Sequence, residues 1–361
     1  MPLVALQAMQ DQVRAAAAAG TPLCITGAGT RQFLGRPVEG AALVTRHYRD
    51  VIDYEPTELV LSARAGTPLA DIETLLAERN QMLAFEPPRF AAAGAPGAPG
   101  GTLGGAIAAG LAGPRRMAVG GVRDFILGAK LLDGKGEVLR FGGQVMKNVA
   151  GYDVARLLAG SLGTLGVLLE ISVKVLPRPA ATRTLRFECS QGEALKRMHP
   201  AGALPLSASC WHAGQLTLRL CGAEVAVRAA VAQLGGEIVE PAAAQAWWTS
   251  LRDQTHPFFK SDQPLWRVAV PPTAPPLDLD AEPLLEWQGG QRWLRGEFDP
   301  ATLRAAARGG HVTLFRARAA LRAEVPVFTP LAAPAARIQR ALKASFDPAG
   351  IFNPQRLYPD L

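Results

Sequence analysis

The chain has 361 residues, enough for two or three domains with buried cores. Hydrophobic residues make up 48% and charged residues 19%, the balance of a folded protein rather than of a disordered one. The net charge of +7 would suit nucleic acid, but no aromatic-basic stripe or recognition motif accompanies the scattered arginines. A basic surface for an acidic partner subunit or for anionic lipid headgroups fits this charge better.

The cysteines and the apolar stretches indicate the compartment. Cys24, Cys189, Cys210 and Cys221 lie far apart, which argues against a disulfide framework and against the clustered thiolates of an iron–sulfur cluster. The N-terminus lacks the features of a signal peptide, and the longest apolar stretch, Leu157–Leu169, is too short to span a membrane. We expect a cytoplasmic protein that reaches the inner face of the membrane, if at all, within a complex.

The first part of the chain predicts helices that alternate with strands. Residues 3–19 predict a helix that ends at Gly20. The residues that follow predict strands at Leu23–Thr26, Ala42–Thr45 and Val60–Ala63, and a helix that runs to about Arg79 with Thr67 as its N-cap and Pro68 as its first residue. The turn after the first strand reads G-A-G-T (27–30).

The middle of the chain is unusually rich in glycine. Thr102–Gly110 predicts a helix of small and apolar residues. The next expected elements are a hairpin of Ile126–Leu132 and Val138–Phe141 about Asp133-Gly134, a short helix at Tyr152–Leu158, and a strand at Val167–Leu176 that ends at Pro177.

After Pro179 the glycine clusters end and the elements form two rough repeats, the pattern of a ferredoxin-like cap. The expected strands are 206–211, 215–221, 237–240, 266–270, 284–288, 292–296 and 312–316, and the expected helices are 224–234 and 300–308. Residues 271–283, rich in proline, predict a loop. The tail K-A-S-F-D-P-A-G-I-F-N-P-Q-R-L (343–357) again carries a strong signature.

The glycine segments indicate a ligand that the backbone approaches closely. They read G-A-G-T (27–30), G-A-P-G-G-T-L-G-G-A (97–106), K-N-V-A-G-Y-D (147–153) and G-S-L-G-T-L-G-V-L-L-E (160–170). Glycine lets an anion reach bare amides, so these loops suit a dinucleotide. A Rossmann fingerprint is a weaker match, because Gln32 stands where the third glycine belongs. A plain turn cluster at 97–105 and a buried strand–turn–strand at 160–170 are the structural alternatives.

Other residues give weaker signals. The five histidines have no metal-ligand spacing, so no metal site is expected. Arg115-Arg116 could meet a phosphate or form a solvated turn. The aromatic residues of 246–259 (Trp247, Trp248, Phe258, Phe259), together with the loop 271–283, are either a docking surface for a partner or, for the tryptophans, part of the core.

The loops, in this order, resemble the FAD-binding domain of the vanillyl-alcohol-oxidase (PCMH-type) flavoprotein family, and most closely its FAD-binding subunits of glycolate oxidase complexes. The resemblance rests on T-G-A-G-T-R-Q-F-L-G (26–35), D-Y-E-P-T-E-L-V (53–60), A-R-A-G-T-P-L (63–69), L-A-F-E-P-P (83–88), G-T-L-G-G (101–105), G-P-R-R (113–116), V-R-D-F-I-L-G (122–128), F-G-G-Q-V-M-K-N-V-A-G-Y-D (141–153), G-S-L-G-T-L-G-V-L-L-E (160–170) and F-D-P-A-G-I-F-N-P (346–354). It covers 21–180 and the tail well, and 181–325 weakly. It implies an α+β protein with a PCMH-type FAD-binding domain over 1–179, a shortened cap over 180–325 and a C-terminal segment, 326–361, that returns to the flavin domain.

The resemblance also implies which residues hold the FAD. The pyrophosphate would lie on Gly27, Ala28, Gly29, Thr30, Arg31 and Gln32. Thr102, Leu103, Gly104 and Gly105 would pass under the isoalloxazine and the diphosphate, Gly121 and Val122 would line the flavin, Gly163, Thr164, Gly166 and Val167 would enclose the adenosine end, and Asn353 would reach back toward the flavin.

Two departures from the family shape the expected function. Relatives with covalent flavin have a histidine where this chain has Thr30, so the FAD is expected to be non-covalent. The H-x-G-D-G-N-x-H motif of catalytic relatives is absent. The resemblance therefore implies an accessory flavin subunit of a complex that oxidises glycolate to glyoxylate, with a larger FAD-binding subunit and an iron–sulfur subunit that passes electrons toward a quinone. A self-sufficient hydroxy-acid dehydrogenase and a non-catalytic scaffold remain alternatives.

Overall fold

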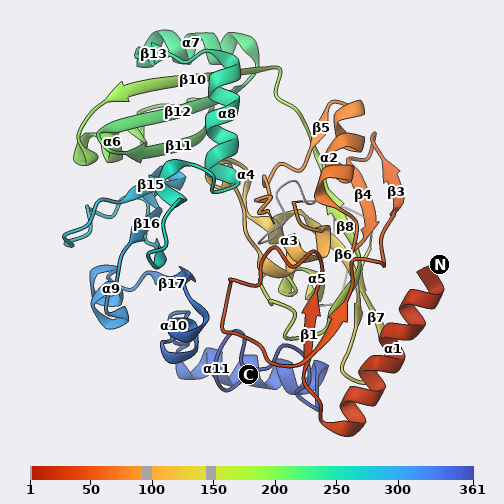
Figure 1. Cartoon of the computed structure of the whole chain (residues 1–361). Helices are drawn as coiled ribbons and strands as arrows, with labels where there is room; N and C mark the ends of the chain where they lie inside the picture. Colours follow the sequence, from red (N-terminus) through yellow and green to blue (C-terminus); the bar gives the residue numbers. More distant parts are fainter. Residues whose placement is uncertain (1, 92–99, 144–151) are drawn as a thin grey trace. The chain divides into compact units, whose positions relative to one another are not determined.

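The computed structural model describes residues 2–91, 100–143 and 152–361. Residues 97–99 and 147–151 of the glycine segments therefore lie outside the described residues. The chain divides into two compact units. The first unit comprises residues 1–111, 121–177 and 330–361, and the second comprises 112–120 and 178–329. The chain thus leaves the first unit twice and returns to it for its last segment (Figure 1).

The first unit is built around an antiparallel five-stranded sheet with the order β3-β4-β8-β6-β7. A parallel pair, β1-β2, and a short pair, β5-β9, complete its strands. The strands are β1 (Leu23–Thr26), β2 (Ala41–Val44), β3 (Val51–Glu55), β4 (Val60–Arg64), β5 (Gln81–Met82), β6 (Ile126–Leu132), β7 (Val138–Gly142), β8 (Val167–Lys174) and β9 (Leu176–Pro177). The helices are α1 (Pro2–Ala19), α2 (Leu69–Glu78), α3 (Leu103–Ala109), η1 (Val122–Phe125), α5 (Val154–Leu157) and α11 (Ala333–Phe346).

The C-terminal segment closes the core of the first unit. Ile351 and Phe352 are buried against Leu23 of β1 and against α1, in one apolar cluster with Val167. Lys343 of α11 donates to Asp347 at 2.6 Å and to the carbonyl oxygens of Thr164 and Phe352 at 2.8 Å. Burial lowers the pKa of Lys343, and Asp347 opposes this shift. The segment after α11 is therefore fixed beside β1.

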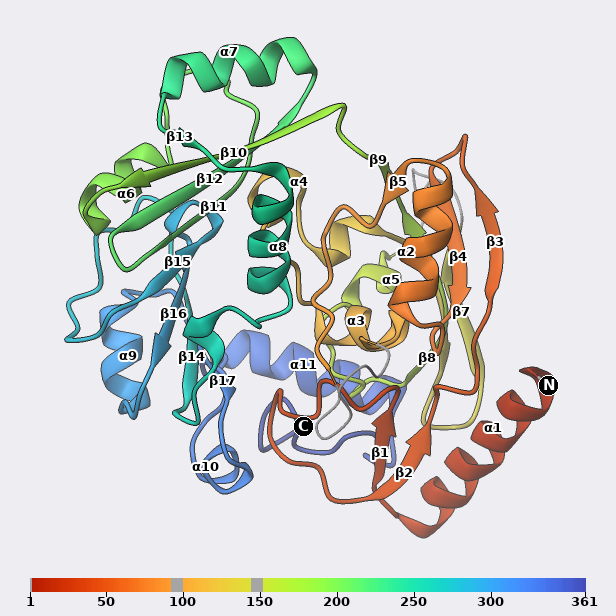
Figure 2. The same cartoon turned by 45° about the horizontal axis from the view of Figure 1, so that its top comes forward.

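The second unit contains a single eight-stranded sheet with the order β13-β10-β12-β11-β15-β16-β14-β17. Its strands are β10 (Ala181–Glu188), β11 (Leu206–His212), β12 (Gln215–Gly222), β13 (Glu237–Ile238), β14 (Leu265–Ala269), β15 (Leu284–Glu286), β16 (Gln291–Arg295) and β17 (His311–Arg316). Its helices are α4 (Arg116–Val119), α6 (Gln191–Arg197), α7 (Glu224–Leu234), α8 (Pro241–Arg252), η2 (Pro257–Phe259), η3 (Trp287–Gly289), α9 (Pro300–Ala306) and α10 (Ala319–Glu324). The pairing of β11 with β15 joins the two predicted repeats into this one sheet (Figure 2).

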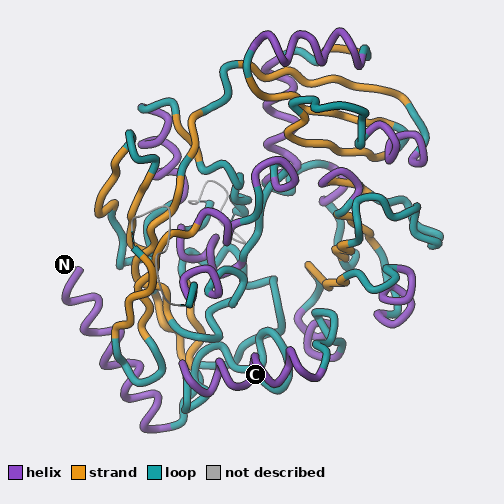
Figure 3. The backbone as a smooth tube through the Cα atoms, turned by 180° about the vertical axis from the view of Figure 1, so that it is seen from behind, coloured by secondary structure: helices purple, strands orange, loops and turns teal. Residues whose placement is uncertain are grey.

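Helices cover both faces of the β10-β12-β11 part of this sheet. α6 and α7 pack their apolar residues on the face that carries Leu185, Leu218 and Leu220. Thr184 points to the other face, because side chains alternate along a strand, and there its hydroxyl accepts a hydrogen bond from Trp248 of α8 at 3.0 Å. Figure 3 shows the strands and helices of each unit from behind.

One sequence-based expectation is wrong. Thr67 is not the N-cap of α2, because its hydroxyl bonds to the backbone N–H and C=O of Asp50 at 3.0 and 3.1 Å, and Pro68 is the N-cap. Of the two alternatives for the aromatic residues of 246–259, Trp248 fits the core, and Phe258 and Phe259 are buried as well, since each of the three is at most 6% exposed. Among the described residues, no helix is long and apolar enough to cross a membrane.

Candidate functional site

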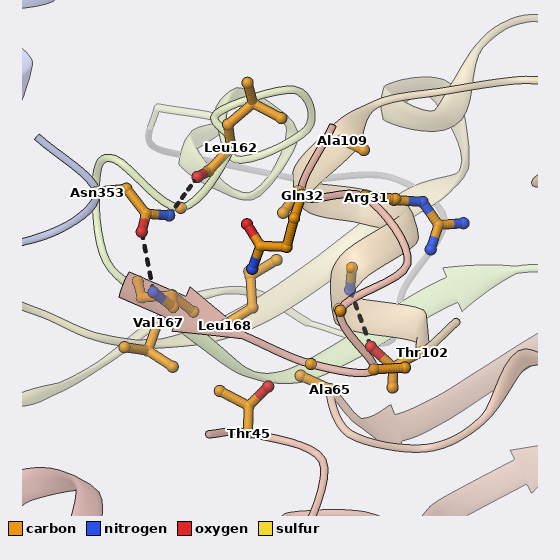
Figure 4. Close-up of a pocket in the computed structure, with 18 of the residues that line it drawn as sticks. Arg31, Gln32, Thr45, Ala65, Thr102, Ala109, Leu162, Val167, Leu168 and Asn353 are labelled. Atoms are coloured by element: carbon orange, nitrogen blue, oxygen red, sulfur yellow. Dashed lines mark hydrogen bonds between the residues drawn. The ribbon is translucent and has the colours of Figure 1, made fainter. Parts of the chain in front are cut away.

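A cavity in the first unit lies where the glycine segments meet. Its walls come from the loop after β1, from the start of α3, from the segment that leads into β8, and from the C-terminal segment (Figure 4). It encloses about 700 Å³ including the part open to solvent, within the range of small-molecule sites.

The loop after β1 offers unused backbone donors to this cavity. The amides of 27–30 donate no hydrogen bond to any residue that the structure describes. Gly29 has φ +73°, a left-handed conformation that favours glycine. Consecutive free N–H groups in such a turn form a concave site for an anion. The loop therefore has the geometry that a diphosphate requires.

The start of α3 uses its amides differently. The N–H of Leu103 donates to Thr67 O at 2.9 Å and that of Gly104 donates to Ala65 O at 2.8 Å. The N–H of Gly105 donates to the hydroxyl of Thr102, which caps the helix at 3.2 Å. A Cβ on Gly104 would lie 2.6 Å from the Cβ of Ala65. The glycine at 104 therefore lets the helix pack directly on the end of β4.

The C-terminal segment fixes the loop after β1 from the opposite side. Asn353 accepts from Ile25 N at 2.9 Å and donates to Leu162 O at 2.6 Å, so it joins two walls of the cavity (Figure 4). Arg356 donates to the side chain of Gln32 at 2.9 Å and to the carbonyl oxygen of Arg31 at 3.1 Å. These contacts hold the loop in its open-amide conformation.

The charge of the cavity is positive. Arg31 and Arg356 line it, and Arg31 also donates to Pro88 O at 2.5 Å. Within the described part of the chain, no Asp, Glu, His, Cys, Lys or Tyr lines the cavity. The same residues contain no group of three His, Cys, Asp or Glu side chains that could hold a metal ion. The described lining thus suits a large anion, and it includes no side chain of the types that take up a proton near neutral pH.

Most of the residues predicted from the sequence come together here. The predicted residues that line the cavity are Gly27, Ala28, Gly29, Thr30, Arg31, Gln32, Thr102, Gly104, Gly105, Gly163, Gly166, Val167 and Asn353. Four do not line it, and their roles stay predictions: Leu103, Gly121, Val122 and Thr164. Leu103 and Val122 are buried in the core, Gly121 N–H donates to Asp124, and the hydroxyl of Thr164 donates to Ser161 O.

The sequence-based assignment missed several lining residues: Ile25, Thr45, Ala65, Ala108, Ala109, Leu162, Leu168 and Arg356. Most contribute apolar surface and carry no local pattern that marks a ligand. Arg356 lies three residues after Asn353 in the tail signature, and this spacing is the signal that could have identified it.

Comparisons with known proteins agree with this site. Residues 5–142 match the FAD binding domain family. The whole chain is 46% identical over 359 residues to the glycolate oxidase subunit GlcE of Escherichia coli, covering 98% of both proteins. The chain belongs to the family of the glycolate oxidase subunit GlcE. It is therefore an oxidoreductase subunit, and its cofactor is FAD.

More distant relatives match part of the sequence or share its fold. The chain is 30% identical over 166 residues to the glycolate oxidase subunit GlcD of Bacillus subtilis, which is 45% of this chain and 34% of that protein. An alkyldihydroxyacetonephosphate synthase structure superposes with a TM-score of 0.65 over 97% of this chain and 75% of that chain, at 14% identity, which shows a shared fold. The predicted α+β fold, the PCMH-type FAD-binding domain and the FAD cofactor are confirmed.

Proposed function

We propose that this chain is the accessory FAD-binding subunit of a glycolate oxidase complex that oxidises glycolate to glyoxylate. In the proposed complex a larger FAD-binding subunit carries out the substrate chemistry, and an iron–sulfur subunit passes the electrons to a quinone-type acceptor. The similarity to GlcE over the whole chain supports the complex. The open amides of the cavity, and the lack of a proton acceptor among its described lining residues, support the accessory role.

The residues of the cavity would hold FAD through its diphosphate. The amides of 27–30 would donate to the phosphate oxygens, and the guanidinium groups of Arg31 and Arg356 would offset their charge. The amides at the start of α3 are already used, so we place the diphosphate on the loop after β1. Bound FAD supplies an acceptor for an electron pair.

The bond between FAD and this chain is proposed to be non-covalent. A covalent link needs a nucleophilic side chain such as His, Cys or Tyr beside the flavin. The described residues that line the cavity include none of these, and Thr30 stands in the first loop.

The accessory role is proposed because the described residues that line the cavity include no proton acceptor. Oxidation of a hydroxy acid needs a base within hydrogen-bonding reach of the hydroxyl proton. Among the described lining residues the titratable side chains are the two arginines, which stay protonated at neutral pH. None of the described lining residues can act as this base, and we propose that it comes from another part of the complex.

The test is to purify the full chain alone and then with its two partner subunits. We expect a yellow protein that releases intact FAD on acid precipitation and does not turn over glycolate or D-lactate with a dye acceptor. After co-expression with the larger flavin subunit and the iron–sulfur subunit, we expect the three chains to co-purify and to oxidise glycolate.

Each alternative has its own outcome in this test. Turnover by the isolated chain would identify a self-sufficient hydroxy-acid dehydrogenase. A colourless chain that does not bind added FAD would favour a non-catalytic scaffold. Flavin that stays on the denatured chain would contradict the proposal that FAD is bound non-covalently. Elution as a free monomer in the presence of both folded partners would contradict the complex.

A further inference from the structure

One face of the five-stranded sheet carries a row of charged residues that crosses four strands. The register pairs Arg64 of β4 with Glu170 of β8. It also pairs Glu170 with Lys130 of β6, and Lys130 with Arg140 of β7. Residues directly opposite each other on antiparallel strands have their Cβ atoms about 5 Å apart on the same face of the sheet. The four side chains therefore form one continuous row.

The neighbouring row on the same face consists of small residues. Two positions away on each of the four strands, and again paired across them, are Ser62, Ser172, Gly128 and Gly142. None of these side chains is larger than a hydroxymethyl group, so they form the floor of a trough beside the charged row. The trough encloses about 570 Å³ including the part open to solvent, and Lys130, Glu170 and Arg140 line it from the charged row.

The backbone keeps the β6–β7 part of this trough free of side chains. A Cβ on Gly128 would lie 2.6 Å from the carbonyl oxygen of Gly143, whose N–H donates to Leu127 O at 3.3 Å. Gly142 turns the chain toward this contact with φ +66°, a conformation that favours glycine. The small residues at 128 and 142 are therefore required by the fold.

One charge of the row has no partner. Lys130 pairs with Glu170 at 2.7 Å, and Arg64 pairs with Asp50 at 3.0 Å. Arg140 is exposed, and within the described residues it makes no hydrogen bond and no ion pair. It also lies directly opposite Lys130, and like charges in this arrangement are unfavourable. An anion beside Arg140 would offset this cost.

We propose that the trough binds an extended, acidic segment of a partner subunit, with a carboxylate of that segment against Arg140. The inference rests on the proposed function, which supplies the partner subunits. The four strands span about 14 Å, the length of about four extended residues. The guanidinium of Arg140 suits a carboxylate, and the chain's net charge of +7 favours association with an acidic partner.

Apolar side chains near the trough fit a protein segment better than a free anion. Ile52, which lines the trough, is 43% exposed, and Val138, on the same face of β7 as Arg140, is 41% exposed. A segment would contact these side chains and the floor together, whereas a free anion would be held by exposed charges alone, which contribute little. A flat bilayer would reach the rim of the trough and not its floor.

The test is co-purification of the full, FAD-loaded chain with a tagged iron–sulfur subunit and the larger flavin subunit, at rising salt concentration. Arg140→Glu should lower the amount of chain retained by roughly fivefold or more, because it replaces attraction by repulsion. Ser172→Tyr should lower it without a change of charge, because the larger side chain fills the floor. Lys135→Glu is the matched control, since Lys135 is exposed in the turn of the same hairpin and does not line the trough. This control should be retained like the parent.

A photo-cross-linker in place of Val138 identifies the occupant. We expect benzoylphenylalanine at this position to cross-link to a partner-subunit peptide that contains Asp or Glu. A cross-link to a second copy of this chain would overturn the proposal. Sedimentation of the parent with phosphatidylglycerol vesicles, abolished by Arg140→Glu while the complex stays intact, would assign the trough to a membrane and would also overturn it.

FAD content and melting temperature are measured for every variant, since Arg140 does not line the FAD cavity and Arg140→Glu should keep both. Equal retention of the parent, Arg140→Glu and a folded Ser172→Tyr would refute this docking site and leave the proposed complex standing. A parent that does not assemble with both folded partners would instead refute the proposed function.

Discussion

Two glycine segments line the same cavity, but their backbone N–H groups have different partners. In the loop after β1, the amides of 27–30 have no partner among the described residues, and a Cβ on Gly29 would meet no atom closer than 4.0 Å. At the start of α3, the amides of 103–105 all have partners, and a Cβ on Gly104 would collide with Ala65. The first segment keeps its backbone free for a ligand, and the second lets two parts of the protein touch.

A high density of glycine therefore indicates that something lies close to the backbone. It does not indicate whether this is a ligand or another part of the protein. The destination of each N–H separates the two cases, because a backbone donor that no protein group satisfies is left to bind a ligand or water. By this criterion the loop after β1 is the binding segment, and α3 is mainly a packing segment. Substitutions in each segment test this division.

The largest effect is expected for Gly29→Val. A β-branched side chain at φ +73° is strained, and its methyl groups would stand over the open amides. We expect the variant to lose nearly all its FAD while it keeps most of its secondary structure. FAD released by acid, per mole of chain, and circular dichroism measure the two quantities.

Gly20→Val is the matched control for this strain. Gly20 follows α1 with φ +63°, a Cβ added to it would have no atom within 4 Å, and it does not line the cavity. The free energy of unfolding of Gly20→Val should fall by about 1–2 kcal/mol, as the same backbone strain would cause in Gly29→Val. The Gly20→Val variant should nevertheless keep its FAD. Equal FAD content in Gly29→Val and in the parent would show that 27–30 is an ordinary turn.

Asn353→Ala tests whether the C-terminal segment supports the binding loop. The change leaves Ile25 N–H and Leu162 C=O without their buried partner, at a cost of about 2–4 kcal/mol. Asn353 has φ +39°, so Asn353→Gly removes the same hydrogen bonds without backbone strain and should cost nearly as much. Urea unfolding measures both. A small loss of unfolding free energy in Asn353→Gly would mean that backbone strain, and not the lost hydrogen bonds, destabilises Asn353→Ala. The C-terminal segment would then not support the binding loop through Asn353.

The sequence predicted elements best where the local pattern was strong. The helix at Glu224–Leu234 has the expected bounds, and the hairpin of β6 and β7 forms about Asp133-Gly134 as expected. β3 (Val51–Glu55) was missed because its residues are exposed or half-buried and carry no apolar alternation. β10 was missed because its threonines and arginines interrupt the apolar pattern that its buried residues would otherwise form.

Long-range pairing could not be read from the sequence. The order of the eight-stranded sheet depends on the contact of β11 with β15, which no local pattern encodes. In the site, Arg356 contacts Gln32 across 324 residues, and no periodicity connects them. The glycine loops were found because close backbone approach constrains residue type, whereas apolar lining residues such as Leu162 resemble ordinary core.

Gly104→Ala tests the packing segment. The added Cβ would lie 2.6 Å from the Cβ of Ala65 and 3.0 Å from its carbonyl oxygen, so α3 must shift away from β4. We expect a loss of about 1–3 kcal/mol in the free energy of unfolding. Gly192→Ala is the control, because this glycine lies in α6 with open space around it and should gain about 0.5–1 kcal/mol. A stable Gly104→Ala variant that has lost its FAD would make α3 a binding segment.

Thr102→Ala gives the smallest and most discriminating effect. The hydroxyl of Thr102 caps α3 by accepting Gly105 N–H, so its loss should cost about 1 kcal/mol, and Thr102→Ser should restore it. The variant also frees the Gly105 amide beside the cavity. If the diphosphate lies on 27–30, FAD affinity, measured by flavin fluorescence, should stay within roughly a factor of three of the parent, because that much corresponds to less than 1 kcal/mol. A clear gain in FAD affinity would mean that the freed N–H of Gly105 donates to a phosphate of FAD. Gly105 would then belong to a binding segment and not only to a packing segment.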